Sequence, residues 1–197
     1  MPLKNIHRHF PNLIAPNDED SIARALGIRD LRVGRHNLRD ESPVPIGHIC
    51  LDTLWILEVV PAFFGFTGLV GVAASHGEEF WGTTSPDWIK AILASGESLF
   101  VQEIELDPLP DVLAQLPLLP KLQNRSRDGI EYYLSIETET VCTGMSFFNP
   151  YLPELVAVEH SCWELADTIA RKSGDETLAS FTKSWQEYLG RHLATAR

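Results

Sequence analysis

The sequence predicts an α+β fold in which an antiparallel or mixed sheet is covered by helices, two of them C-terminal. Three observations support this prediction. Apolar runs over residues 54–60 and 66–74 are rich in Val, Leu, Phe and Trp, which is typical of strands buried on both faces. Residues 130–147 alternate between apolar and polar side chains, and residues 153–189 repeat apolar side chains at helical spacing.

The first predicted element is a short helix that begins after Asn17 and ends at Leu26. The Asn17 side chain can accept hydrogen bonds from the first free amides of the helix, and Gly27 suits the left-handed backbone that ends one. Arginine-rich residues 29–39 then predict a surface loop or a short helix.

After the two apolar strands, the sequence predicts a second helix over residues 86–95. Ser85 is a suitable cap, Pro86 suits the first helical position, and Gly96 would follow the end. Residues 100–106 predict a strand, and the four prolines of residues 107–120 permit at most a two-turn helix.

The C-terminal third predicts a β-hairpin followed by two helices. Residues 130–137 and 141–147 alternate with a period of two around a turn at residues 138–140. Pro153 can open a helix on which Glu159 and His160 are expected on the solvent face. Ser173 and Glu176 have capping-box spacing for the last helix, although Gly174 could instead end the helix before it.

Composition predicts one cytoplasmic domain. The chain has 197 residues, 44% of them hydrophobic, which suffices for a single core over residues 1–197, and residues 1–45 could form a partly detached N-terminal segment. A net charge of −11 disfavours nucleic acid and anionic membrane surfaces as partners. No apolar signal segment follows the N-terminal charges, and three cysteines without CxxC spacing predict free thiols in a reducing compartment.

Charge is distributed unevenly along the sequence. Residues 42–120 contain ten carboxylates and a single basic residue, Lys90, whereas the 41 residues before them contain seven Lys or Arg and six Asp or Glu. A region of one sign attracts partners of the opposite sign and accelerates their encounter. The acidic middle third therefore favours a function in binding a basic protein partner.

The predicted contacts are acidic residues of this region together with one tryptophan. The carboxylates would pair with Lys or Arg of the partner, and Trp81 would fill a pocket. The alternative is that these carboxylates form ordinary solvated surface. The predicted partner-binding residues are Glu78, Glu79, Trp81, Glu103, Glu105, Asp107 and Asp111.

In size, acidity and lack of a catalytic signature, the chain resembles the bacterial immunity proteins that neutralise toxic nucleases or other effectors. The resemblance is one of profile and involves no motif. It implies an inhibitor that blocks a basic toxin by occlusion, with no cofactor of its own. Another possibility is a structural subunit that buries the apolar residues 59–75 at a homo-oligomer interface.

The alternative class is a small serine hydrolase. The sequence Ala-Ala-Ser-His-Gly at residues 73–77 resembles a degenerate nucleophile elbow, in which Ser75 would act with His160 or His192. An elbow requires a helix directly after the serine, and the residues that follow break the chain after about one turn. His160 is also placed to form a simple surface pair with Glu164, four residues on. Catalysis is therefore the less favoured interpretation.

Metal binding is not predicted. His76 lies near Glu78 and Glu79, His48 near Cys50, and His7 near His9, but no partner motif completes any of these sets. We therefore expect no metal and no cofactor.

Overall fold

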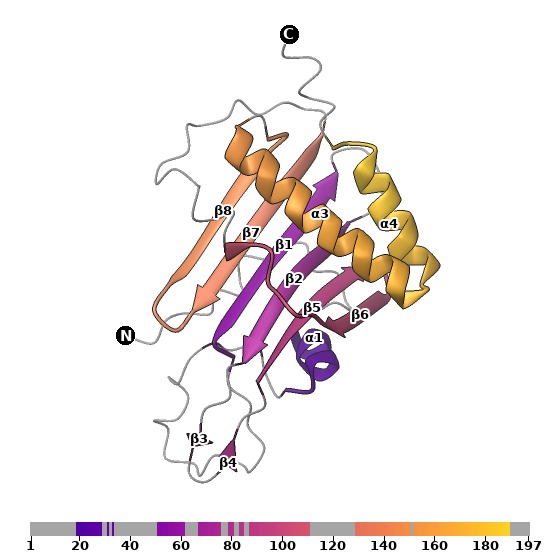
Figure 1. Ribbon diagram of the computed structural model, residues 1–197. Helices are drawn as coiled ribbons and strands as arrows, with labels where there is room; N and C mark the ends of the chain where they lie inside the picture. The colour runs from indigo at the N-terminus through magenta and orange to yellow at the C-terminus, as the bar shows by residue number, and fades with distance from the viewer. Residues whose placement is uncertain are drawn as a thin grey trace.

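The computed structural model describes residues 19–28, 31, 33, 51–61, 67–75, 79–80, 83–84, 87–110, 129–150 and 152–189. Over these residues the chain is α+β, as predicted: a six-stranded antiparallel sheet with helices packed on its faces (Figure 1). The helices are α1 (Glu19–Leu26), α3 (Pro153–Ser173) and α4 (Glu176–Gln186). The strands of the main sheet are β1 (Thr53–Pro61), β2 (Gly68–Ser75), β5 (Trp88–Ser95), β6 (Ser98–Glu103), β7 (Ile130–Thr138) and β8 (Cys142–Phe148). A separate ladder joins β3 (Glu79–Phe80) to β4 (Thr83–Thr84).

The strand order of the main sheet is β6-β5-β2-β1-β7-β8. In the central strands, Trp55 of β1 lies opposite Val72 of β2 and Ile136 of β7. Because side chains alternate between the two faces of a strand, this register separates the buried residues into two cores, one on each face of the sheet.

One face is covered by α3 and α4, with α3 lying across the strands (Figure 1). The apolar stripe of α3 packs against odd-numbered residues of β1, and aromatic side chains fill the space between sheet and helices. Tyr132 stacks on Phe147 with ring centroids 4.9 Å apart, and Trp185 lies 5.8 Å from Phe181. Gly68 leaves room for Phe181, since a Cβ at residue 68 would approach its ring to 2.5 Å.

The opposite face carries α1, whose buried side chains are Ile22, Ala23 and Leu26. They pack against the even-numbered residues of β1 and β5 and the odd-numbered residues of β2. The ammonium group of Lys90 in β5 donates to the carbonyl of Leu26 at 2.9 Å and lies 4.5 Å from the centroid of the Trp88 ring. A cation therefore satisfies a free carbonyl at the C-terminal end of α1.

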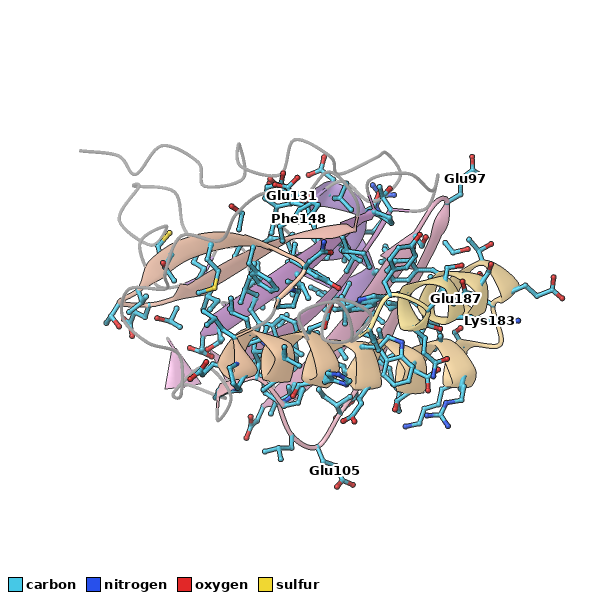
Figure 2. The ribbon with its side chains drawn as sticks, turned by 90° about the horizontal axis from the view of Figure 1, so that it is seen from above. Glu97, Glu105, Glu131, Phe148, Lys183 and Glu187 are labelled. Carbon is cyan, nitrogen blue, oxygen red and sulfur yellow. The ribbon has the colours of Figure 1, made fainter. Side chains whose placement is uncertain are left out.

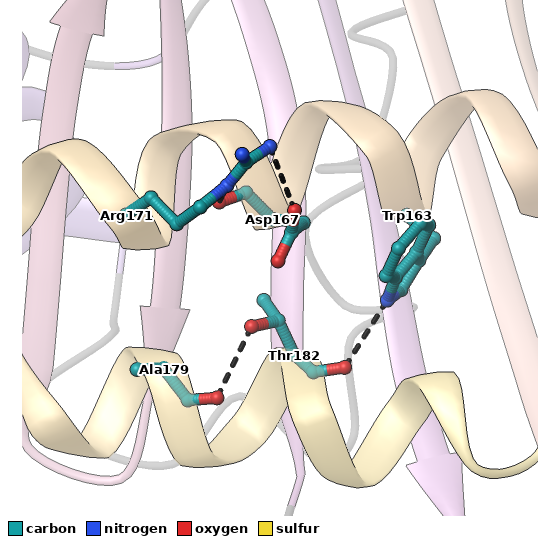
Figure 3. A network of polar contacts seen from close by, with 5 residues as sticks. All are labelled: Trp163, Asp167, Arg171, Ala179 and Thr182. Carbon is teal, nitrogen blue, oxygen red and sulfur yellow. Dashed lines mark hydrogen bonds and ion pairs between the residues drawn. The ribbon is translucent and has the colours of Figure 1, made fainter.

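The two C-terminal helices are joined at Gly174, whose φ of 69° is the left-handed conformation that ends α3. Asp175 then caps α4 by accepting from the amides of Thr177 and Leu178, so the predicted cap at Ser173 is wrong. Between the helices, Nε1 of Trp163 donates to the Thr182 carbonyl at 3.1 Å (Figure 3).

The helix predicted over residues 86–95 is wrong, because Trp88–Ser95 form strand β5. The apolar residues that suggested a helical stripe belong to a strand covered on both faces, with Ile89 and Leu93 on one side and Trp88 and Ile92 on the other. The two apolar strands, the hairpin and the helix after Pro153 are confirmed. The predictions for residues 1–18 and 34–50 lie outside the described residues.

Candidate protein-binding surface

After β6 the chain turns onto the helix-covered face of the sheet. We call residues 104–110 the crossing segment; Figure 1 shows it running from β6 toward β1 beside α3. Its first amide, that of Ile104, donates to the carbonyl of Ile89 at 2.9 Å. Near its other end, Leu109 is fully buried in the core shared with α3 and α4. Both ends of the segment are thus attached to the fold.

Asp107 fixes the middle of the crossing segment. Both of its carboxylate oxygens lie 3.0 Å from the indole nitrogen of Trp55, and Oδ1 also accepts the Leu109 amide at 2.9 Å. Burial raises the pKa of Asp107, and these hydrogen bonds oppose the rise by favouring the charged form. This predicted partner contact is therefore engaged within the fold as an anchor.

With its neighbours fixed, Leu106 extends into solvent with 75% of its surface exposed. Glu105 is also exposed and points away from the sheet on the helix side (Figure 2). Leu106 is not among the predicted contacts, because the sequence predicts a strand over residues 100–106, whereas β6 ends at Glu103. The signal was Asp107-Pro108, since proline disfavours further strand pairing and aspartate favours a turn.

Glu103, another predicted contact, does not lie on the same face as Leu106. Glu103 ends β6 opposite Lys90, on the face that carries α1. Glu97 lies in the turn at the other end of the β5–β6 hairpin, and Glu58 is buried in β1. Glu103 and Glu105 thus lie at the same end of the sheet but not on the same face. Glu78, Trp81, Asp111 and the side chain of Glu79 lie outside the described residues.

A second set of polar side chains is enclosed between the sheet and the helices. The Tyr132 hydroxyl donates to Oε1 of Glu159 at 2.5 Å and accepts from Nε1 of Trp185 at 2.9 Å. Glu159 is only 1% exposed, so its expected place on the solvent face of the helix is wrong. The Tyr132 hydroxyl explains the difference, because it gives the buried carboxyl a hydrogen-bond partner.

Burial controls the protonation of this cluster. It raises the pKa of Glu159 to about 7, and the hydrogen bond from Tyr132 limits the rise. Burial also raises the pKa of the Cys162 thiol, and the negative charges of Asp107 and Glu159 add to this rise. Glu58, buried in β1, has its pKa raised to about 7 by burial alone, and its Oε1 has no hydrogen-bond partner. Because the Glu159 cluster joins β7, α3 and α4 and is shielded from solvent, we assign it a structural role.

The structure does not bring Ser75 and His160 together, so this version of the serine-hydrolase alternative is wrong. Ser75 is fully buried at the end of β2, and its side chain lies on the α1 face of the sheet, in line with Ala73. His160 is exposed on α3, which covers the other face. The chain continues into β3 after three residues instead of the helix that an elbow requires. His192 lies outside the described residues.

In the part of the chain that the structure describes, no group of three or more His, Cys, Asp or Glu side chains is arranged to hold a metal ion. Over the same residues, no helix is both long enough and apolar enough to cross a membrane. Cys142 and Cys162 are free thiols, the first exposed and the second buried. Comparisons with protein-family models, with curated proteins and with solved structures find no match.

Proposed function

We propose that this chain is a cytoplasmic protein that binds a basic protein partner and acts by occlusion, in the manner of an immunity-type inhibitor. The observation that carries the proposal is the exposure of Leu106 on a segment fixed by Asp107 and by the buried Leu109. On a fixed backbone, an exposed apolar side chain can supply contact area to a partner without further ordering of the chain.

The crossing segment is suited to binding because its backbone is already ordered. Association loses free energy when it must immobilise a flexible loop, and a segment held at both ends avoids most of that loss. Leu106 would supply apolar contact area, while Glu105 beside it would pair with Lys or Arg of the partner. Asp107 contributes by holding the segment in place.

Charge supports a basic partner over an acidic or neutral one. The net charge of −11 accelerates encounter with a cationic surface and opposes encounter with an anionic one. Among the described residues, exposed cations such as Arg171, Lys172 and Lys183 belong to helices α3 and α4. Arg171 is paired with Asp167 at 2.8 Å (Figure 3). None of these cations belongs to the crossing segment.

Site-specific photo-crosslinking in the producing cells tests this proposal. A photoreactive amino acid replaces Leu106 in the full-length chain, and the same residue replaces Ser180, which is exposed on α4, as the matched control. We expect a crosslink from residue 106, but not from residue 180, to one protein with a basic surface. Crosslinks of equal yield at both positions, or a crosslink from residue 106 only to acidic proteins, would overturn the proposal.

A further inference from the structure

Strand β8 ends the sheet on the side away from β6, and its free edge is open among the described residues. Cys142, Thr143, Gly144 and Ser146 are all exposed. An exposed Gly144 means exposed backbone, because glycine has no side chain. The edge therefore presents main-chain groups as well as side chains to solvent.

The hairpin register shows which main-chain groups face outward. The Thr138 amide donates to the Val141 carbonyl at 2.7 Å, and at the other end of the hairpin the Asn149 amide donates to the Ile130 carbonyl at 3.1 Å. Hydrogen-bonded and non-hydrogen-bonded pairs alternate in an antiparallel ladder. The odd-numbered residues of β8 therefore bond to β7, and the amides and carbonyls of Cys142, Gly144 and Ser146 point away from it.

Among the described residues, this edge lacks the usual protection against strand pairing. Residues 142–148 include no charged residue and no proline, and of the outward-facing residues Cys142, Gly144 and Ser146 have small side chains or none, whereas Phe148 is large. Packing does not require glycine at residue 144, since a Cβ there would lie 3.6 Å from the Leu134 carbonyl, an ordinary contact. The other edge strand, β6, lies against α1 and ends at Glu103.

Carboxylates flank the open edge. Glu131 and Glu137 of β7 lie opposite Phe148 and Cys142, and Glu139 is exposed in the hairpin turn. Figure 2 shows Glu131 and Phe148 together on the side of the sheet away from α3 and α4. The pKa of the Cys142 thiol is raised by partial burial and by the nearby charge of Glu137.

We propose that β8 binds an extended, basic segment of another protein, which adds to the sheet as a further strand. Main-chain hydrogen bonds to Cys142, Gly144 and Ser146 would provide affinity, and cationic side chains directed toward β7 would provide selectivity. An added strand would lie about 10 Å from β7, two strand spacings, which a Lys or Arg side chain and a Glu side chain can span together. The path to Glu137 crosses the small Cys142 side chain, whereas the path to Glu131 crosses Phe148.

A second copy of this chain fits the edge less well, because two chains of net charge −11 repel each other. The inference rests on the proposed function for the basic character of the partner. The surface is different, however, since β8 and the crossing segment belong to different parts of the fold, and each can be tested without the other.

Amide hydrogen exchange of the full chain tests strand addition directly. The probe is a synthetic peptide of alternating Lys and Thr, as long as β8. In the free protein, the amides of Cys142, Gly144 and Ser146 should exchange rapidly, while those of Thr143, Met145 and Phe147 are protected by β7. Saturating peptide should slow the first set by about tenfold or more and leave the second set nearly unchanged.

Substitutions at residue 144 provide the matched variants. Gly144→Pro removes the outward N–H without removing a bond to β7, and it should weaken peptide binding by about tenfold or more. Gly144→Ala keeps that N–H and should bind like the original chain. If Gly144→Pro fails to fold, Ser146→Pro removes the neighbouring outward N–H in the same way.

Three results would overturn the inference: no slowing of the outward amides at saturating peptide, equal binding of a Glu-Thr peptide, or slowing that depends on protein concentration without peptide. The last result would indicate self-pairing. If the Lys-Thr peptide fails to bind while the crosslink from residue 106 forms, strand addition is wrong and the proposed function stands. If the peptide binds while that crosslink is absent, the Leu106 surface is wrong and strand addition stands.

Discussion

The carboxylate of Asp107 receives the indole N–H of Trp55, with both oxygens 3.0 Å from Nε1. This contact joins the crossing segment to the central strand β1 across 52 residues of sequence. It also means that one acidic residue of the middle third serves the fold, and that the exposed Leu106 beside it has a fixed position.

Asp107→Ala should lower the free energy of unfolding by about 1–3 kcal/mol, because the indole of Trp55 and the amide of Leu109, both buried residues, lose their acceptor. Urea unfolding measures the change. Asp107→Asn is the control, since its side-chain oxygen can still accept, and it should lose less. Equal stability of the original chain and Asp107→Ala would contradict the anchoring role.

Glu159 should make stability depend on pH. Its pKa rises from 4.5 to about 7 on folding, so the folded state binds its proton more tightly. The resulting stabilisation is complete below about pH 4.5 and is lost as the pH rises through about 7. The free energy of unfolding of Glu159→Gln, relative to that of the original chain, should therefore increase by about 3 kcal/mol as the pH rises from 4.5 to 8.

Denaturant titrations at several pH values check this gain. Glu164→Gln, at an exposed position of the same helix, is the control and should show no comparable gain. If the free energy of unfolding of Glu159→Gln and that of the original chain change with pH in the same way, Glu159 does not titrate as described.

Tyr132 and Trp185 should be energetically coupled through the hydroxyl that they share. Tyr132→Phe removes the donor to Glu159 Oε1 and should lower the free energy of unfolding by about 1–3 kcal/mol. Trp185→Phe should lower it by about 1 kcal/mol for the lost hydrogen bond, with a further loss for the smaller buried contact area. In a double-mutant cycle, the double mutant should lose less free energy of unfolding than the sum of the two single losses, because either substitution alone removes the hydrogen bond between Tyr132 and Trp185. Trp163→Phe, whose indole donates to Thr182 instead, should be nearly additive with Tyr132→Phe. Strict additivity in the first cycle would argue against the cluster.

Two strand glycines should respond differently to alanine. A Cβ at residue 71 would approach the Trp55 carbonyl oxygen to 2.5 Å, so Gly71→Ala should lower the free energy of unfolding by about 1–3 kcal/mol. Gly144→Ala meets only an ordinary contact and should be nearly neutral. Thermal unfolding of the two variants checks the contrast, and a neutral Gly71→Ala would mean that β1 and β2 can move apart at that point.

Local sequence signals predicted the C-terminal part of the fold well. The two-residue period of the hairpin and Pro153 before the long helix each reflect the chemistry of neighbouring residues, and the structure has both. Strand β5 could not be distinguished from a helix in this way, because a strand covered on both faces loses its alternation. Its identity depends on α1 and α3, which lie far away in sequence.

The site was less predictable than the fold. Acidic residues close in sequence separate in space, since Asp107 faces the core and Glu97 and Glu103 occupy opposite ends of one hairpin. The exposure of Leu106 depends on the Asp107–Trp55 contact, which joins two distant segments. The burial of Glu159 likewise depends on a tyrosine in another element. Pairing between distant segments determined each of these outcomes.

The most direct test of the central claim is the association rate constant between this chain and the protein crosslinked from residue 106, measured by stopped flow over a range of salt concentrations. We predict that the rate falls about tenfold or more as salt rises from about 0.01 to 0.5 M, because screening removes the attraction between the acidic chain and its basic partner. We also predict that Leu106→Ala mainly accelerates dissociation. An association rate that is independent of salt, with dissociation unchanged by Leu106→Ala, would contradict the account.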